Sequence, residues 1–148
     1  MSEPTEIIPG VFVGDQFTAK DQLFFKKNNI TRVVNCTPDV PFYFPGVRYY
    51  RIPIGDSSHF DDNDIMARNL PVAVGFIMEA QPGKYRGVLI HCHVGVSRSC
   101  TVAVALLRTC FTNTIDEAIK IVVSKRPVAF FNGNHFNFMK ALKQVYGK

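Results

Sequence analysis

The sequence predicts an α/β fold, a central, largely parallel sheet of four to five strands flanked by helices. Short apolar runs typical of strands alternate along the chain with longer stretches of helical spacing. Such alternation is typical of a parallel sheet that helices cover on both faces. The run Val88–His91 is too apolar for an exposed face, as expected of a central strand. The length of 148 residues, 47% of them hydrophobic, predicts one domain over residues 1–148.

The first half of the chain is expected to supply most of the strands. Residues 11–13 form a short strand, and residues 17–28 have the spacing of a helix with its charged side chains outward. A second strand is expected at Arg32–Asn35. After a loop rich in proline and aromatic residues over 38–46, a third strand is expected at residues 49–52.

The second half is expected to be mainly helical. The spacing over residues 62–80 predicts a long helix that Pro71 should kink or divide. Residues 99–111 are apolar almost all round, so they should form the buried helix. Thr114, with Glu117 three residues later as in a capping box, predicts a helix through about residue 124. A last helix is expected over roughly residues 134–146.

Residues 88 to 99, VLIHCHVGVSRS, carry most of the functional information. The apolar run ends at Cys92, a short loop follows, and a helix is expected to begin beside Arg98. A strand that turns through a short loop into a helix points several backbone N–H groups at one spot, where the helix dipole adds positive potential. The spacing therefore predicts an anion site, most naturally for phosphate.

The residue types in this loop suit phosphate chemistry. Gly95 can adopt a positive φ or let the backbone approach a ligand closely. The planar guanidinium of Arg98 can bind two phosphate oxygens at once. Cys92 is expected at the floor of the loop, in a field that favours a thiolate and so creates a nucleophile.

These residues resemble a known signature. His91-Cys92-x-x-Gly95-x-Ser97-Arg98-Ser99 is similar to that of the cysteine-dependent protein phosphatases, in the form used by the dual-specificity branch. Three further segments, in the family's order, extend the resemblance over nearly the whole chain: residues 7–14, 29–35 and 50–56. The chain resembles the small atypical type, which has no preceding docking module. The resemblance implies a phosphate-binding loop between the central strand and the buried helix.

The resemblance also implies a role for each matching residue. Cys92 attacks phosphorus to form a phosphocysteine, and Arg98 binds the phosphoryl group and stabilises the transition state. Asp56 protonates the leaving oxygen and then acts as base for the hydrolytic water. Ser99 donates its hydroxyl to the departing sulfur, and His91 supports the loop. The phosphate is expected to be surrounded by His93, Val94, Gly95, Val96, Ser97 and Arg98.

The assignment of Asp56 as the proton donor rests on the least specific sequence signal. An aspartate that follows a glycine, as Asp56 follows Gly55, is often only a turn former. Asp61, Asp62 and Asp64 compete for the role, although they are better suited to capping a following helix, where negative charge is stabilised.

No cofactor and no metal are expected. His91, Cys92 and His93 are adjacent metal-ligand types, but neighbouring residues on an extended segment point to opposite sides. The four cysteines form no Cys-x-x-Cys pair. A Cys36–Cys92 disulfide under oxidation is left open, because some relatives keep a partner cysteine near the position of Cys36.

The resemblance implies phosphorylated protein substrates. Tyrosine-specific relatives are longer and have an added loop that deepens the pocket, so a shallow site for phosphotyrosine and phosphoserine/phosphothreonine is expected here. Phosphoinositide-directed relatives place lysines in the loop, where this chain has His93, Val94 and Val96. Three alternatives stay open: a phosphatase of phosphoinositides or other non-protein phosphates, a non-catalytic phosphate-binding module, and a sulfur-transfer or arsenate-reducing enzyme.

The chain departs from the family's pattern in two places. Residues 134–139 stand where the family has a Pro-Asn segment before its last helix. By analogy, residues 128–134 should form part of the pocket wall, where Phe130 and Phe131 either grip a substrate side chain or pack in the core. The second departure is Cys100, where small residues or proline are common.

Charge and composition indicate which kinds of partner and which compartment are expected. The net charge of +5 suits anionic substrates, but the scattered lysines and arginines do not indicate a nucleic-acid partner. No run approaches the roughly 20 apolar residues of a membrane span. The polar N-terminus does not resemble a signal peptide, and the unpatterned cysteines favour a reducing compartment, so cytoplasmic or nuclear localisation is expected. The oligomeric state is left open.

Overall fold

The protein is described here by a computed structural model that covers residues 3–55, 60–80, 87–130 and 138–147. Within these residues five strands form one sheet in the order β1-β2-β5-β3-β4. Only the β1–β2 pair is antiparallel, while the other three pairs are parallel. The predicted α/β fold is confirmed. The strands are β1 (Thr5–Ile8), β2 (Val11–Gly14), β3 (Arg32–Asn35), β4 (Arg48–Arg51) and β5 (Val88–His91).

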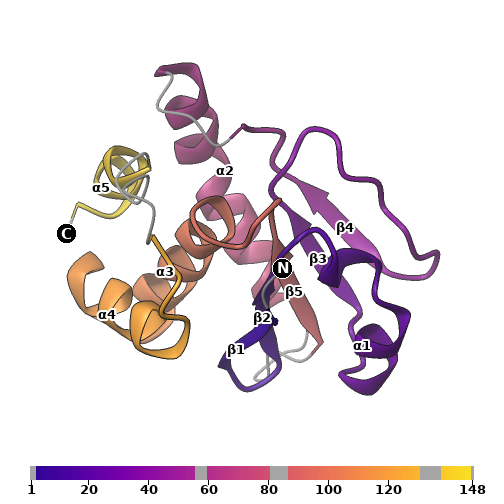
Figure 1. Cartoon of the computed structure of the whole chain (residues 1–148). Helices are drawn as coiled ribbons and strands as arrows, with labels where there is room; N and C mark the ends of the chain where they lie inside the picture. Colours follow the sequence, from indigo (N-terminus) through magenta and orange to yellow (C-terminus); the bar gives the residue numbers. More distant parts are fainter. Residues whose placement is uncertain (1–2, 56–59, 81–86, 131–137, 148) are drawn as a thin grey trace.

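Helices cover both faces of this sheet (Figure 1). One face carries α2 (Phe60–Met78), α3 (Arg98–Cys110), α4 (Ile115–Lys125) and α5 (Met139–Tyr146), and the other carries α1 (Gln22–Lys27). β5 is central and fully buried, as its apolar sequence predicts. Helix α3 follows β5 directly and is buried along nearly its whole length, so the chain turns sharply at the carboxyl end of the central strand.

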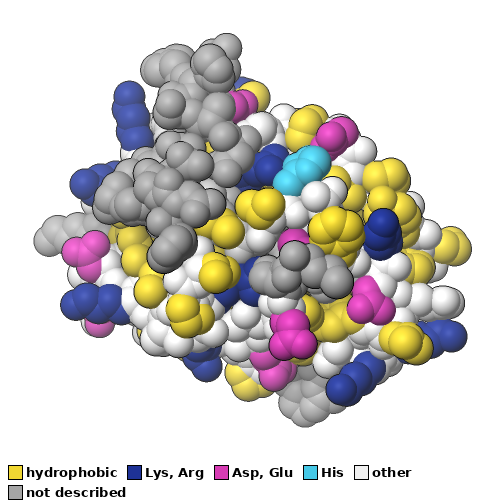
Figure 2. Space-filling model, in the orientation of Figure 1, with side chains coloured by type: hydrophobic (Ala, Val, Ile, Leu, Met, Phe, Trp, Pro, Cys, Tyr) yellow, Lys and Arg dark blue, Asp and Glu magenta, His cyan; other side chains and the backbone are white. Residues whose placement is uncertain are grey.

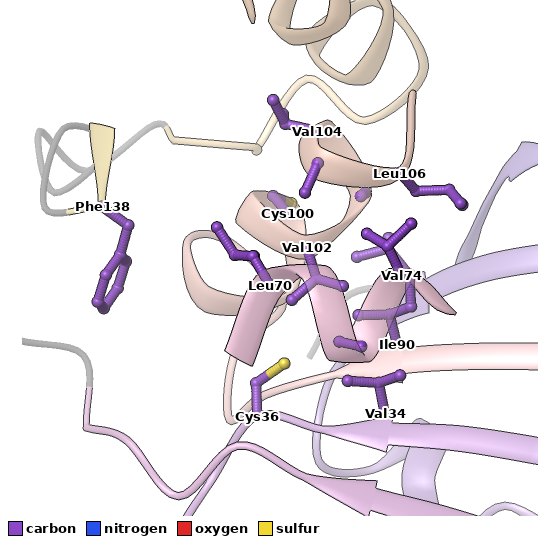
Figure 3. Packing of buried hydrophobic residues seen from close by; sticks show 14 of the residues in the cluster. Val34, Cys36, Leu70, Val74, Ile90, Cys100, Val102, Val104, Leu106 and Phe138 are labelled. Carbon is purple, nitrogen blue, oxygen red and sulfur yellow. The ribbon is translucent and has the colours of Figure 1, made fainter. Parts of the chain in front are cut away.

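Alternate residues of the strands supply two hydrophobic clusters. Val34 and Ile90 belong to the main core with residues of α2 and α3, and Figure 3 shows them facing Val74 and Val102. Their strand neighbours point to the opposite face, where Val33 and Leu89 pack with Phe25 of α1 and Ile30. The end of β5 is thus held from both sides, and this fixes the loop that follows it.

The predicted helix over residues 17–28 is wrong as a single element. A short 3-10 helix, η1 (Thr18–Lys20), is separated from α1 by Asp21 in an extended conformation. The carboxylate of Asp21 accepts a hydrogen bond from the N–H of Phe24 at 3.2 Å and so caps α1. The side chain of an aspartate can accept the backbone hydrogen bonds that would otherwise continue a helix. The spacing of apolar residues does not reveal this.

The other predicted elements appear with small shifts. α2 continues through Pro71 and is not divided there. Thr114 caps α4 as predicted, since its hydroxyl accepts from the N–H of Glu117 at 3.1 Å. Of the predicted last helix, residues 134–137 lie outside the described residues. Strand β1, which pairs in antiparallel fashion with β2, was not predicted as a separate strand.

Candidate active site

Cys92 follows β5 immediately, and its sulfur faces into the 92–98 loop. The backbone N–H of Gly95 donates to Cys92 Sγ at 3.2 Å. The hydroxyl oxygen of Ser99, in the first turn of α3, lies 3.3 Å from the same sulfur. Cys92 is only 1% exposed. The loop thus brings two groups that can donate hydrogen bonds to one sulfur atom at the amino end of a buried helix.

Arg98, the first residue of α3, lies beside this sulfur-containing floor. Its Nη1 donates to the backbone oxygen of Ile54 at 2.8 Å. Its Nε is buried and has no hydrogen-bond partner among the described residues. Because buried donors are rarely left unpaired in folded proteins, this N–H indicates a place for an anionic ligand. One N–H of the guanidinium is thus fixed by Ile54, and a second N–H has no partner among the described residues.

An arginine from outside the motif supports the loop from below. Arg126, just after α4, is buried, and its Nε donates to the backbone oxygen of Gly95 at 2.7 Å. Its Nη1 also bonds Glu3 O and Thr5 Oγ1, both at 2.8 Å. Arg126 was not predicted as a site residue, because a lone arginine in a Lys-Arg-Pro segment resembles ordinary surface charge. Its partners lie far away in the sequence, and only the fold brings them together.

Gly95 is required at its position for two reasons. Its φ is +70°, in the left-handed region that side chains disfavour. A Cβ added there would lie 2.8 Å from the backbone oxygen of Gly14 and 2.6 Å from Nη2 of Arg126. The predicted close approach of backbone at Gly95 is therefore present, and β2 and Arg126 impose it.

The two histidines that flank Cys92 have opposite environments. His91 is buried, and its Nδ1 lies 3.2 Å from the backbone oxygen of Cys92. Burial lowers the pKa of His91 to about 4, so its ring is neutral at physiological pH. A carbonyl oxygen only accepts, so we assign the proton to Nδ1. The ring then steadies the start of the loop without adding charge.

His93 is half-exposed and pairs with Asp39, a residue that was not predicted to belong to the site. Its Nε2 lies 2.8 Å from Oδ1 of Asp39, which belongs to the segment between β3 and β4. The hydrogen bond from His93 lowers the pKa of Asp39, with a smaller contribution from Arg98. Asp39 thus carries negative charge at the edge of the loop. No signal in the sequence links these residues, which are 54 positions apart.

The predicted acid, Asp56, lies outside the described residues, and its role stays a prediction. Ile54, two positions before it in the chain, is the residue whose carbonyl Arg98 holds. Of the competitors, Asp61 and Asp62 lie in the first turn of α2, and Asp64 follows in the same helix. The carboxylate of Asp64 is paired with Arg68 at 3.3 Å. All three positions lie inside α2, so none of them precedes the helix as a cap, although negative charge in the first turn is stabilising.

Two other cysteines lie near the loop and are poor nucleophiles. Burial raises the pKa of Cys36 far above its usual value, and the neighbouring Cys92 raises it further. Burial also raises the pKa of Cys100 to about 12. Cys36 and Cys92 are separate thiols in this structure, and their disulfide under oxidation stays a prediction.

The turn after α4 supplies part of the wall beside the loop. The N–H of Phe130 donates to the backbone oxygen of Val96 at 2.9 Å. Phe130 packs against the main core, which favours the core interpretation of this side chain, whereas Phe131 lies outside the described residues. Val128, which is partly exposed, lines a pocket next to the 92–98 loop.

Neither a metal centre nor a membrane-spanning helix is found in the part of the chain that the structure describes. No three His, Cys, Asp or Glu side chains cluster there so that they could hold a metal ion. None of the helices described combines the length and apolar character needed to cross a bilayer.

A comparison with protein-family models shows to which family the chain belongs. Residues 11–147 match the family model described as the dual specificity phosphatase catalytic domain. The chain belongs to the dual specificity phosphatase family. This match includes the whole 92–98 loop and confirms the resemblance drawn from four separate segments of sequence.

Individual dual specificity phosphatases are similar over most of this chain. Mpk3 of Drosophila melanogaster is 38% identical over 143 residues, which cover 94% of this chain and 33% of that protein. Human dual specificity protein phosphatase 6 is 35% identical over 144 residues, 95% of this chain and 36% of that protein. The chain thus spans about a third of the length of these curated relatives.

Solved structures support the same fold. Human DUSP28 superimposes with a TM-score of 0.85 at 24% identity, and the match covers 99% of this chain and 95% of that chain. The mostly parallel sheet and the loop between β5 and α3 therefore belong to a fold that dual specificity phosphatases share.

Proposed function

We propose that this chain hydrolyses phosphotyrosine and phosphoserine/phosphothreonine in proteins through a phosphocysteine intermediate. The observation that carries the proposal is the environment of Cys92 Sγ. The sulfur accepts from the N–H of Gly95 and lies beside the Ser99 hydroxyl, next to an arginine with an unpartnered buried donor. Family membership and the 35–38% identity to named dual specificity phosphatases support the same activity.

The first step forms a sulfur–phosphorus bond. The substrate's phosphate binds to backbone N–H groups of the loop and to Arg98, which stabilise charge on its oxygens in the transition state. Cys92 Sγ supplies the electron pair for the S–P bond while the bond from phosphorus to the substrate oxygen breaks. Asp56 transfers its proton to that leaving oxygen, which departs as a neutral hydroxyl.

The second step releases phosphate. Asp56, now a carboxylate, accepts a proton from water as the water oxygen attacks phosphorus. The S–P bond breaks and its electrons return to sulfur, where the hydroxyl of Ser99 can donate a hydrogen bond, since it lies 3.3 Å away. The enzyme ends with Asp56 protonated and Cys92 ready for another cycle. Because a catalytic thiol needs reducing conditions, we also propose a cytoplasmic or nuclear site of action.

Protein substrates are favoured over phosphoinositides by the side chains of the loop. The positions between Cys92 and Ser97 hold His93, Val94, Gly95 and Val96, with no lysine to bind further phosphates. The half-exposed His93 is itself engaged by the carboxylate of Asp39. A headgroup with several phosphates would meet little additional positive charge here.

Direct assay of freshly reduced protein tests this function. An aryl phosphate and peptides carrying phosphotyrosine or phosphothreonine should all be hydrolysed, with activity that survives chelators and falls with vanadate, a mimic of five-coordinate phosphorus. Absence of hydrolysis with retained phosphopeptide binding would instead favour a non-catalytic phosphate-binding module. Arsenate reduction without phosphate release would favour the reductase alternative.

A paired substitution tests the acid. Asp56→Asn should lower kcat most for substrates with poor leaving groups, because these need the proton most. The matched control is Asp62→Asn, a competitor in the first turn of α2, which should leave the leaving-group dependence unchanged. The reverse result would assign the acid to Asp62.

A further inference from the structure

A pocket of about 250 Å³ lies directly beside the 92–98 loop. Its volume suits a single side chain better than a whole small-molecule ligand. Figure 2 shows one face of the molecule, on which hydrophobic, basic and acidic side chains all lie near the histidine drawn in cyan. The pocket is lined by Asp15, Gln16, Phe17, His93, Val94, Val96 and Val128.

The walls of this pocket are hydrogen-bonded to the loop that would hold phosphate. On one side the N–H of Gln16 donates to the backbone oxygen of His93 at 3.0 Å. On the other, the N–H of Phe130, two residues after Val128, donates to the backbone oxygen of Val96 at 2.9 Å. The pocket and the phosphate site therefore share one loop, and their separation is fixed by backbone bonds.

The exposed surface of the pocket is mainly apolar. Phe17, Val94 and Val128 are 44%, 50% and 41% exposed, although large apolar side chains are usually buried. They come from three separate segments and meet at one place beside the site. An apolar patch of this kind next to a polar site is typical of a ligand-binding surface.

The charged lining does not favour a second phosphate. Asp15 is buried, and its Oδ1 accepts hydrogen bonds from the N–H groups of Phe17 and Thr18. His93 is paired with Asp39. None of the described lining residues is lysine or arginine. An uncharged, apolar group is the occupant that this lining accommodates at the lowest desolvation cost.

We propose that this pocket binds an aliphatic side chain of the protein substrate, one or two residues from the phosphorylated residue. An extended peptide advances about 3.3–3.6 Å per residue, so a close neighbour of a phosphoresidue bound over Cys92 reaches the adjoining pocket. The inference rests on the proposed phosphatase activity and adds substrate selection to it. Phe17 and Val128 act here as specificity-determining residues, while the chemistry stays with the loop.

The test compares matched phosphopeptides. A phosphotyrosine is placed in a glycine-serine peptide with glycine at the two positions before it and the two positions after it. In each of four further peptides, leucine replaces one of these four glycines. With the reduced enzyme, kcat/KM for the best leucine peptide should exceed that of the all-glycine parent by about tenfold, the scale of apolar pocket discrimination. A ratio near one at all four positions would overturn the inference and leave the proposed function intact.

Variants of the pocket then test whether the preference for leucine depends on its lining residues. Phe17→Ser and Val128→Ser should each reduce the leucine-to-glycine ratio to about threefold or less, because part of the apolar wall is lost. Phe111→Ser and Val123→Ser are the matched controls, since both side chains are exposed but neither lines this pocket. The controls should keep the parent's ratio. An equal fall in the controls would overturn the inference.

Two further outcomes separate this inference from the function on which it rests. No hydrolysis of any peptide or of an aryl phosphate would overturn both. Faster hydrolysis of phosphatidylinositol phosphates in phosphatidylcholine vesicles than of every peptide would overturn the peptide subsite while leaving a phosphatase.

Discussion

The floor and the rim of the candidate site differ in how the chain builds them. The floor, formed by Cys92, Arg98 and Ser99, comes from one contiguous stretch, and each of its residues is at most 5% exposed. The rim, formed by Phe17, Asp39 and Val128, comes from three distant segments and is largely open to solvent. The residues proposed for the chemistry therefore come mainly from local sequence, whereas tertiary structure brings together the residues around them.

The two regions also differ in how firmly they are held. Arg126 and the carbonyl of Gly14 confine the loop at Gly95, and Ile54 holds the guanidinium of Arg98. The rim depends on single hydrogen bonds, such as the His93–Asp39 pair. Substitutions in the floor should therefore have large effects on turnover or folding, and substitutions at the rim should have small ones.

The largest effect is expected at the floor arginine. Arg98→Lys keeps the charge but loses the planar fork, so kcat/KM for an aryl phosphate should fall about a hundredfold to a thousandfold. Arg108→Lys, on the same helix but with Tyr146 as a partner, is the control and should retain activity. Equal activities of the two variants would remove Arg98 from the phosphate site.

The next largest effect is expected at Gly95, where the loop is packed tightly against the end of β2. Gly95→Ala places a Cβ against the carbonyl of Gly14 at a positive φ, so the free energy of unfolding should fall by about 2 kcal/mol or more. Gly75→Ala is the control, because a Cβ at Gly75 in α2 meets no atom within 4 Å. That change should stabilise the helix by up to about 1 kcal/mol. Urea unfolding of both variants measures these changes in free energy. A Gly95→Ala protein as stable as the parent would contradict the close approach of Gly95 to the carbonyl of Gly14.

A third prediction concerns acid stability and His91. Burial lowers its pKa from 6.5 to about 4, so below pH 6.5 the unfolded chain gains a proton that the folded protein does not. Stability present above pH 6.5 is therefore lost as the pH falls towards 4, by about 2 kcal/mol at pH 5. Urea unfolding at pH 7.5 and pH 5 should show a smaller drop for His91→Gln than for the parent. Equal drops would mean that His91 is protonated in the folded protein.

The smallest effect is expected at the rim. Asp39 is exposed, and a carboxyl whose pKa is lowered by His93 is a poor proton donor. Asp39→Asn should therefore change kcat/KM for an aryl phosphate by less than about threefold, with the difference fading in high salt. A tenfold fall in kcat that grows with poorer leaving groups would move Asp39 from the rim to the catalytic groups.

The fold class, and the position of Cys92, Arg98 and Ser99 in one loop between β5 and α3, could be predicted from the sequence. The strand, loop and helix around Cys92 follow from an unbroken apolar run, a glycine and a nearby arginine. The split between η1 and α1 was missed because the capping bond of Asp21 outweighs apolar spacing. Strand β1 was missed because its sequence, TEII, has two polar residues followed by two apolar ones and shows no alternation of apolar and polar residues.

The rest of the site depends on contacts that have no local signal. Arg126 resembles a surface arginine until the fold places it under Gly95, more than thirty positions away in the chain. The same holds for Asp39, whose partner His93 lies in a different element of the fold. Pairings of this kind arise from strand order and loop packing, which a single sequence does not encode at any one position.

Trapping the covalent intermediate tests the central claim most directly. A ³²P-labelled phosphotyrosine peptide is mixed with the reduced enzyme, and the reaction is quenched within milliseconds and digested. The label should appear on the peptide that contains Cys92, and it should be absent from Cys92→Ser, which should still bind the substrate. Turnover that persists in Cys92→Ser, or phosphate release by the parent without label on Cys92, would contradict nucleophilic catalysis by this sulfur.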